Sequence, residues 1–382
     1  ATANKLYRVT TEPQARRLFG VSELADAVTR SLQNGAYPVY AIAPEVKSVT
    51  DDLTSQATVS GSLSQAPVSE VSTDALFTID SEAKTTILTR EDLSGISPAS
   101  GEVYVNQATG AFKLDGIPSS DGDVSFKYLD YSAALIAMEN EAGGEIDWLG
   151  VLTENEDVRD SLETQVNRMA QVYKPVIGVV GTLKVADTSA FTNPFDNSRM
   201  QVLYYPRDAS GESMIGGYLG VRAEIGVRQS GMRKRISGFE TLGDPLTEAE
   251  KVDMDESKVV VFEYGTSGIR TMNDPTCVSD SNSDEQAYNH GLARLLGDYI
   301  TLRVEARADP YIGLLHNPGA RAALRAEVRQ DMLALLDLNA VEAFSVDVEE
   351  IDSVRARLTV GVQMAKPLRN IEFVLVGGDV AA

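Results

Sequence analysis

One segment without a charged or hydrogen-bonding side chain, PVIGVVG at 175–181, constrains the fold more than any other part of the chain. A strand that is apolar on both faces has to be covered on both faces, which is typical of the inner strands of parallel sheets flanked by helices. Helical patterns precede it at 155–173 and follow it at 212–226, and MQVLYYP (200–206) adds another strand. The sequence therefore predicts an α/β fold, with a β/α layer covered by helices.

The opening of the chain has the same rhythm. Strands are predicted for KLYRVT (5–10) and YPVYAIAP (37–44), with two helical segments between them. Ser22 is placed to cap the second helix, and Gly35 follows its end. We expect a β-α-β unit whose two strands run parallel.

A stretch of different composition interrupts this rhythm. Between about residue 47 and residue 127, Ser, Thr, Asp and Gly dominate and short alternating segments follow one another. This pattern is typical of an antiparallel β insertion, with Ala108-Thr109-Gly110 as a hairpin turn. After residue 245 come two long helices and further strands, an α+β arrangement. The predicted domains are 1–46 and 129–245 for the two parts of the α/β domain, 47–128 for the β-rich insertion and 246–382 for the C-terminal α+β domain.

The chain closes on ARLTVGVQMAKPLRNIEFVLVGG (356–378), which reads as two strands joined through residues 366–370. Two strands alone are marginally stable in water, and the end strand of a sheet exposes unpaired N–H and C=O groups. We expect this pair to complete a sheet either within the molecule or in a neighbouring copy.

The charge balance limits the partners. The chain has 56 acidic and 34 basic residues, a formal net charge of −22. A protein that coats duplex nucleic acid needs a basic face, so this class is excluded. A charge excess keeps a protein soluble, and concentrated salt screens the repulsion within it. The composition fits a protein from a high-salt environment and also an ordinary acidic protein.

Residues for metal or acid–base chemistry are scarce. Cys277 is the single cysteine, which excludes an internal disulfide, and His290 and His316 are the two histidines. GVVGT (178–182) lacks the glycine spacing of a phosphate loop, and GTSG (265–268) is not a nucleophile elbow. No apolar run is long enough to span a bilayer, and the first residues lack the features of a signal peptide. We expect no catalytic residues, no metal and no cofactor.

A stripe of arginines is the sharpest candidate for binding. Arg321, Arg325 and Arg329 are spaced by four residues and therefore share one face of a predicted helix. This face could bind an acidic surface of another protein. It could equally be a solvated stripe that Glu327 and Asp331 partly neutralise.

A second basic cluster lies in the segment GVRQSGMRKRI (226–236). On an acidic chain such a cluster favours a contact between subunits over nucleic-acid binding. Its members are Arg228, Arg233, Lys234 and Arg235.

Several segments, in this order, resemble one known family. RVTTEPQARRLFGVSELADAVTRSLQNGAYPVYAIAP (8–44) resembles the start of the tail sheath proteins of contractile phages and related injection machines. GEVYVNQATGAFKL and VSFKYLDYSAAL are similar to the β insertion of that family and its exit. GESMIGGYLGVRAEIGV takes the place of the family's helix of small residues, and 284–337 with RLTVGVQMAKPLRNIEFVLV resembles the sheath C-terminal domain.

The resemblance implies a structural function without enzymatic activity. Sheath subunits polymerise as stacked rings around an inner tail tube and contract from a metastable extended state, which drives the tube through a cell envelope for genome delivery. The implied partners are further copies, the tube protein, and baseplate and tail terminator proteins, without direct contact with nucleic acid or membrane. The implied location is the virion tail, assembled in the host cytoplasm, and the acidic composition favours a virus of a salt-loving archaeon.

The resemblance also implies roles for particular residues. Terminal strands of adjacent sheath subunits extend a sheet in the C-terminal domain, an arrangement called β-augmentation. The C-terminal domain lies innermost in the family, so Arg321, Arg325 and Arg329 are the candidates for contact with the tube. The candidates for strand pairing between subunits are Val360, Val362, Ile371, Phe373 and Leu375.

Two other classes of protein remain open at this point. A Rossmann-like enzyme would share the β/α rhythm, but it needs a glycine-rich phosphate turn or a cluster of acid–base residues, and neither is found. A surface-layer or other secreted structural protein would be compatible with the acidic surface and the β insertion.

Overall fold

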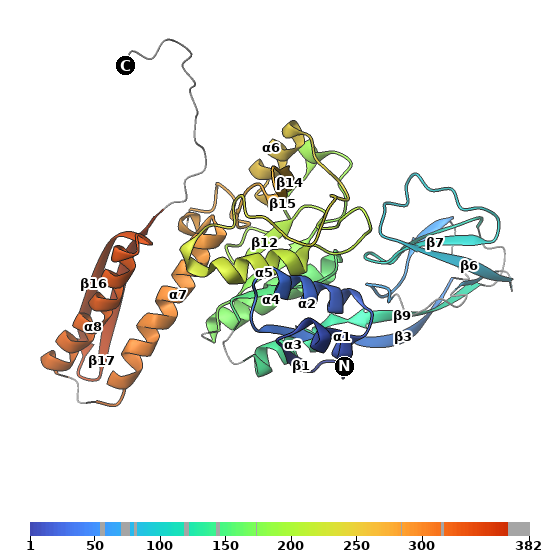
Figure 1. The fold of residues 1–382 in the computed structure, drawn as a ribbon. Helices are drawn as coiled ribbons and strands as arrows, with labels where there is room; N and C mark the ends of the chain where they lie inside the picture. The colour runs from blue at the N-terminus through green and yellow to red at the C-terminus, as the bar shows by residue number, and fades with distance from the viewer. Residues whose placement is uncertain are drawn as a thin grey trace, which may run out of the picture. The chain divides into compact units, whose positions relative to one another are not determined.

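The computed structural model divides into two compact units (Figure 1). The first comprises 1–226 and 231–295, and the second comprises 227–230 and the chain from Leu296 onward. The predicted boundary after residue 245 falls inside the first unit, and the predicted division into domains stays a prediction. The structure describes residues 1–53, 58–69, 77–79, 82–117, 122–142, 146–172, 174–283, 285–314 and 317–365.

A parallel sheet forms the centre of the first unit, as the apolar segment at 175–181 predicted. Helices α4 and α5 pack against β11, and every residue of β11 is buried. The predicted covering of this strand by helices is confirmed. The elements, in sheet order for the strands, are β10 (Trp148–Gly150), β11 (Ile177–Gly181), β12 (Met200–Leu203) and β13 (Val259–Val260), with α4 (Glu156–Gln171) and α5 (Ile215–Ile225).

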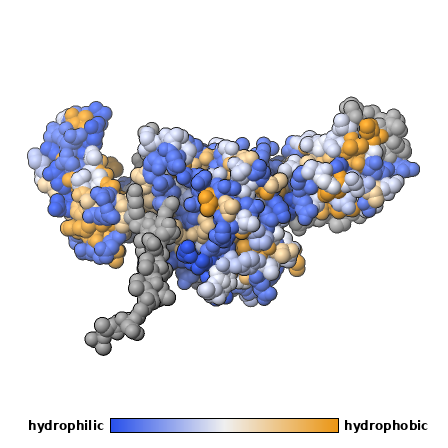
Figure 2. Space-filling model, turned by 90° about the horizontal axis from the view of Figure 1, so that it is seen from above, coloured by the Kyte–Doolittle hydropathy of each residue, from blue (hydrophilic) through white to orange (hydrophobic). Residues whose placement is uncertain are grey.

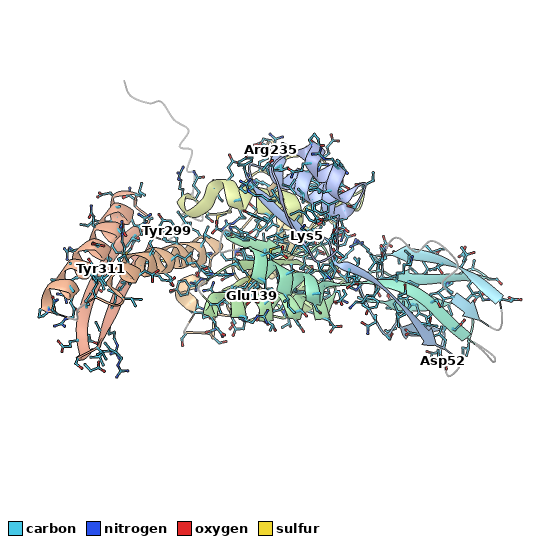
Figure 3. All side chains as sticks on the ribbon, turned by 90° about the horizontal axis from the view of Figure 1, so that it is seen from below. Lys5, Asp52, Glu139, Arg235, Tyr299 and Tyr311 are labelled. Atoms are coloured by element: carbon cyan, nitrogen blue, oxygen red, sulfur yellow. The ribbon has the colours of Figure 1, made fainter. Side chains whose placement is uncertain are left out.

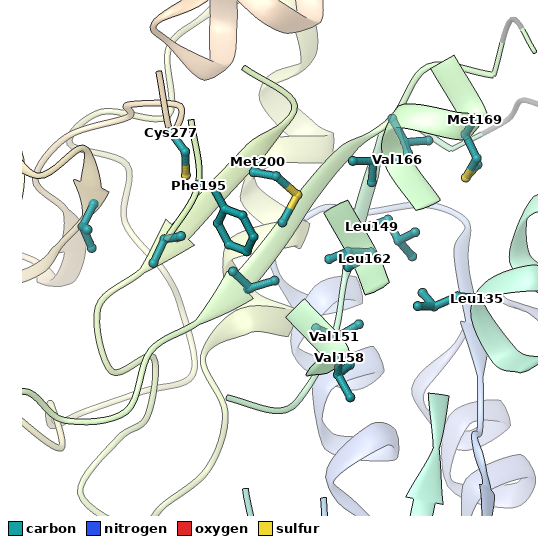
Figure 4. Packing of buried hydrophobic residues seen from close by; sticks show 14 of the residues in the cluster. Leu135, Leu149, Val151, Val158, Leu162, Val166, Met169, Phe195, Met200 and Cys277 are labelled. Carbon is teal, nitrogen blue, oxygen red and sulfur yellow. The ribbon is translucent and has the colours of Figure 1, made fainter. Parts of the chain in front are cut away.

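The main core lies between this sheet and α4. Leu162 and Val166 of α4 are fully buried and belong to one apolar cluster with Met200 of β12 (Figure 4). Gly178 of β11 lies under this helix, where an added Cβ would come within 3.2 Å of Val166 Cγ1. The sheet and the helix are therefore in tight contact.

The first two strands run antiparallel, so the prediction of a parallel β-α-β unit is wrong. β1 (Leu6–Val9) pairs with β2 (Val39–Ile42), with Leu6 opposite Ile42. Two helices lie between them, α1 (Glu12–Phe19) and α2 (Glu23–Gln33). One helix returns the chain for a parallel strand, whereas two consecutive helices reverse it twice and bring the second strand back in the opposite direction. The predicted cap is present, since Ser22 Oγ accepts from the backbone N–H of Ala25 at 3.2 Å.

The backbones of helices α2 and α5 are in close contact. A Cβ on Gly216 would lie 2.2 Å from the backbone O of Ala27, and one on Gly220 would lie 2.4 Å from the backbone O of Ser31. Ser31 Oγ also donates to the backbone O of Gly216 at 2.7 Å. The small residues of α5 are therefore required by its contact with α2.

In its described residues, the insertion forms a sheet of seven strands with its own apolar cluster, which includes Phe77, Phe112 and Val124. Its turn at residues 108–110 is confirmed, because Gly110 has a φ of +72° and donates to the backbone O of Asn106 at 2.8 Å. One pair, β6 and β7, is parallel, contrary to the antiparallel expectation, since residues 90–101 cross over between them. The sheet order is β3 (Glu45–Asp52), β9 (Gly122–Asp130), β5 (Phe77–Ile79), β6 (Glu82–Thr89), β7 (Glu102–Asn106), β8 (Ala111–Leu114) and β4 (Ser60–Ser62).

Shorter elements complete the first unit. The capping box of α6 uses Thr247 and Glu250. The remaining elements are α3 (Tyr131–Glu141), α6 (Glu248–Glu256), β14 (Phe262–Gly265), β15 (Gly268–Thr271) and the 3₁₀ helices η1 (Thr188–Ala190) and η3 (Gln286–Tyr288). The 3₁₀ helix η2 (Gly226–Arg228) crosses the boundary, with Val227 and Arg228 in the second unit.

The second unit packs two helices against two strands. The boundary between the units falls within α7 (Gly291–Ala308), which begins seven residues later than the predicted helix start at 284 because η3 occupies part of the interval. The other elements are η4 (Asp309–Tyr311), α8 (Pro318–Asp337), β16 (Val341–Asp352) and β17 (Arg355–Met364).

Candidate assembly surface

A long two-stranded ribbon dominates the second unit. β16 has 12 residues and β17 has 10, and they pair antiparallel with Val346 opposite Val360 and Phe344 opposite Val362. The partner of 356–364 is thus the preceding strand. The predicted following strand, with Ile371, Phe373 and Leu375, lies outside the described residues.

The ribbon has an apolar face and a polar face because side chains alternate along a strand. Val360 and Val362 join the apolar clusters that include Met332 of α8 and Ile300 of α7. On the polar face, Arg357 donates to Glu349 at 3.1 Å. The two valines therefore pack within the core of their own unit, and their part in pairing between subunits stays a prediction.

The two outer edges of the ribbon are its most unusual feature. Within the described parts of the chain, β16 and β17 pair with each other and with no third strand. Each outer edge of an antiparallel ribbon presents a row of backbone N–H and C=O groups to a possible partner strand. A two-stranded ribbon is marginal alone and needs further strands or a helix against one face, and here α7 and α8 cover the apolar face. The arrangement is suited to strand addition.

The arginine stripe of α8 lies along β16. Arg321 pairs with Glu350 at 2.8 Å, and Arg325 pairs with Asp347 and donates to the backbone O of Val348 at 3.2 Å. The guanidinium of Arg329 lies 6.0 Å from the ring centroid of Phe344. All three residues thus have intramolecular contacts on one strand. Their predicted contact with a tube stays a prediction.

A carboxylate joins the two helices that support the ribbon. Asp331 of α8 has an 8% exposed side chain and accepts from Arg307 Nε at 2.7 Å and from Arg303 Nη2 at 3.3 Å, both from α7. The hydrogen bond from Arg307 holds the pKa of Asp331 below its ordinary value. Arg303 also lies 5.5 Å from the ring centroid of Tyr299, a residue labelled in Figure 3. Asp331 therefore belongs to the packing of the unit and does not neutralise the arginine stripe.

The second basic cluster is divided between the units. Arg228 belongs to the second unit, and the other three residues belong to the first. In the first unit, Arg233 and Arg235 are exposed, and the backbone around Lys234 pairs with β15 (Figure 3). The predicted contact between subunits at Arg228, Arg233, Lys234 and Arg235 stays a prediction.

Sequence reasoning missed a ring of four alternating charges in the first unit. Arg90 pairs with Glu23 at 2.9 Å and with Glu154 at 3.2 Å, and Arg207 pairs with Glu23 at 2.9 Å and donates to Glu154 at 2.7 Å. The ring connects α2, the β insertion and the carboxyl ends of β10 and β12. The two partners of Arg207, Glu154 and Glu23, are 53 and 184 residues away from it along the chain, so the spacing of residues in the sequence could not reveal the ring.

The other sequence motifs belong to ordinary strands and turns of the fold. GVVGT is the buried exit of β11, and GTSG is the turn between β14 and β15. His290 is 8% exposed, and His316 lies outside the described residues. Within the described ranges, no three His, Cys, Asp or Glu side chains gather closely enough to hold a metal ion. In the same ranges, no helix has the length and apolar character needed to cross a membrane.

Comparison with known proteins identifies the fold. No family model matches the chain, and no curated protein matches it by sequence. Solved structures do match. The contracted helical sheath of the anti-feeding prophage has a TM-score of 0.60 at 13% identity, over 99% of this chain and 89% of that chain. The chain has the fold of contractile sheath proteins.

Two further sheath structures agree with this result. The contracted PVC sheath of an extracellular contractile injection system has a TM-score of 0.57 at 11% identity, over 99% of this chain and 88% of that chain. A sheath tail protein from Listeria innocua has a TM-score of 0.56 at 12% identity, over 95% and 92% of the two chains. The predicted fold class, a helix-covered sheath domain with a β-rich insertion and a C-terminal α+β part, is confirmed.

Replacing Asp331 by Asn should loosen the support of the ribbon. Because the pKa of Asp331 is lowered in the folded state, its ionised form stabilises the fold above the ordinary value of 3.8, and this contribution is lost as the pH falls through the lower folded value. We expect Asp331→Asn to lower the free energy of unfolding at pH 7 by about 1–3 kcal/mol, measured by urea denaturation. The difference from the unsubstituted protein should narrow below pH 3.8.

Asp337→Asn is the matched control, since Asp337 is exposed on the same helix. It should change the free energy of unfolding by less than about 0.5 kcal/mol. Equal effects of the two substitutions would contradict a special contribution of Asp331.

Proposed function

We propose that the chain is a structural subunit of a contractile sheath, which polymerises around an inner tube and shortens to drive that tube through a cell envelope. One observation carries the proposal: a long ribbon without a third strand in the described residues, on a fold that matches sheath structures over 99% of the chain. The mechanism needs no nucleotide and no catalytic residue. Its energy is stored in the packing of subunits in the extended state.

Strand addition is the proposed link between subunits. A strand that forms about five backbone hydrogen bonds, each contributing a net ~0.5–1.5 kcal/mol, adds only a few kcal/mol. One link is therefore weak, but every subunit of a polymer forms it. A mesh of such links keeps neighbours connected while their other contacts rearrange. Val360 and Val362 hold β17 on the helices through their apolar contacts. The outer backbone edge of β17, on the side away from β16, is the one proposed to pair with another subunit.

The proposed partners are further copies of the chain, a tube protein, and baseplate and terminator proteins at the ends of the sheath. The proposed location is the tail of a virion assembled in the host cytoplasm. The surface is suited to a salt-loving host: hydrophilic residues cover most of the face in Figure 2, and the net charge is −22. At molar salt the screening length is about 3 Å, so separated carboxylates no longer repel one another.

Removal of residues 368–382 tests the proposed strand link. We expect this truncation to leave a soluble monomer, because the last predicted strand is lost while β16, β17 and their helices are retained. Electron microscopy of the full chain should show rings or tubes. Normal tubes from the truncated chain would contradict the link, and flat lattices from the full chain would favour a surface-layer protein.

Charge reversal at Arg325 tests the predicted tube contact. Arg325→Glu should abolish assembly on added tubes, measured by co-sedimentation and electron microscopy. The substitution also breaks the pair with Asp347, so Asp347→Asn is the matched control that removes the same pair and keeps the arginine. The control should still assemble on tubes. Unchanged binding of Arg325→Glu to tubes would mean that the arginine stripe contacts only solvent and β16.

Thermal unfolding in salt tests the proposed adaptation. Between 0.1 and 2 M NaCl at pH 7, we expect the melting temperature to rise by roughly 5 °C, the change that ~2 kcal/mol produces in a large domain. The same experiment near the isoelectric point of about 4.5 is the control, because little net charge is left to screen there. A melting temperature that does not rise at pH 7 would identify an ordinary acidic protein.

A further inference from the structure

The chain passes between the two units at three places, and at each of them contacts inside the first unit fix the backbone. It leaves after Gly226, returns at Gly231 and leaves again after Leu295. Arg222 and Asp274 make these contacts with the backbone. They form an ion pair at 2.8 Å, and both side chains are 0% exposed. None of the mechanism proposed above uses this pair.

The first departure follows directly from Arg222. This residue lies in the last turn of α5, and its backbone O accepts from the N–H of Gly226, which ends the helix with a φ of +52°. The return is held by the partner of Arg222. Asp274 Oδ2 accepts both from Arg222 Nη1 and from the backbone N–H of Gly231, each at 2.8 Å. The carbonyl of Gly231 accepts from Thr271 Oγ1, so both backbone groups of this residue are bound.

The second departure depends on the backbone of the same aspartate. The N–H of Gly291, the first residue of α7, donates to the backbone O of Asp274 at 3.1 Å. Asp274 Oδ1 accepts from Gln201 Nε2 at 3.0 Å, and Gln201 Oε1 accepts from Tyr218 at 2.6 Å. The carboxylate is therefore fixed to β12 and α5.

Two glycines in these places leave no room for a side chain. A Cβ on Gly231 would lie 2.2 Å from Arg222 Nη1, and one on Gly291 would lie 2.7 Å from Asp274 Oδ1. The remaining face of the guanidinium is covered by Trp148, whose ring centroid is 4.4 Å away. The ion pair, the two glycines and the tryptophan form one closely packed group, which we call the anchor.

We propose that the anchor fixes the points at which the chain enters and leaves the first unit, so that flexing is confined to residues 227–230 and to α7 beyond Leu295. Burying an ion pair is costly, all the more here because Arg222 Nε and Nη2 are buried without a hydrogen-bond partner among the described residues. A hydrophobic pair of similar volume is often as stable. The pair gives what a hydrophobic pair cannot, an acceptor for the Gly231 amide. Arg222 and Asp274 are thus positioning residues. Their relevance to contraction rests on the proposed function, but their effect on the connecting segments does not.

Hydrogen exchange of the full, unassembled chain, followed by mass spectrometry, tests the proposal. Asp274→Asn removes the charge and one of the two acceptor oxygens. We expect amides in 227–232 to exchange about tenfold faster or more, while amides in 288–295, whose backbone acceptor on residue 274 is kept, and peptides from β11 change much less. Glu154→Gln is the matched control: it breaks an equally buried pair with Arg207 in the same unit, without a bond to either connection.

A second variant keeps the test decisive if Asp274→Asn does not fold. Arg222→Met combined with Asp274→Leu leaves no buried charge unpaired. It removes the acceptor of the Gly231 amide but keeps the backbone acceptor of the Gly291 amide. We expect fast exchange at Gly231 and near-normal exchange at Gly291, a difference that a general loss of stability would not produce.

Two results would contradict the proposal that the anchor fixes the connecting segments. One is unchanged exchange of the amides in 227–232 in either variant. The other is an equal increase in 227–232 in Glu154→Gln. Sheath assembly is scored separately by electron microscopy, so a protein that fails to form sheaths but shows the expected exchange would contradict the proposed function and leave the anchor intact.

Discussion

The pairing of backbone groups in the β16–β17 ribbon is the constraint on which the rest of the second unit depends. Two strands of 12 and 10 residues bury one face against α7 and α8, and among the described residues no further strand pairs with either outer edge of the ribbon. In monomeric proteins such edges are usually covered, charged or short. β16 carries carboxylates of its own, and arginines of α8 pair with two of them, Asp347 and Glu350. The fold thus holds the ribbon on a support of two helices.

Charge is distributed differently inside and outside the protein. The surface carries most of the net charge of −22, whereas the interior of the first unit contains compensated groups, the four-residue ring and the Arg222–Asp274 pair. Exposed charges lose their mutual interaction in concentrated salt, but buried pairs are screened far less. An acidic protein built in this way can change its surface interactions with salt while the contacts that hold its elements together persist.

Local patterns predicted the elements that depend on local physics. The apolar segment at 175–181 identified β11, and the glycine at 110 identified a turn that needs a positive φ. The direction of β1 against β2 was missed because it depends on how two helices pack together, not on the pattern of either strand. The Arg222–Asp274 pair was missed because its members are 52 residues apart and each is an ordinary charged residue in the sequence. A signal was present, since the small residues Gly216 and Gly220 mark a buried helix that also contains Arg222.

In the proposed function, work is stored and released without a nucleotide, and these features bear on how the chain would do so. The links between subunits have to persist while the packing changes, so the flexible parts must be short and their ends fixed. Residues 227–230 form one such short connection, with Arg222 before it and the bound Gly231 after it. A longer or looser connection would let a subunit dissipate strain in its own chain, and the same packing energy would then move the neighbour less. Rigid anchors at the ends of short connections favour transfer of the motion through the strand links, which is the property that a contracting polymer requires.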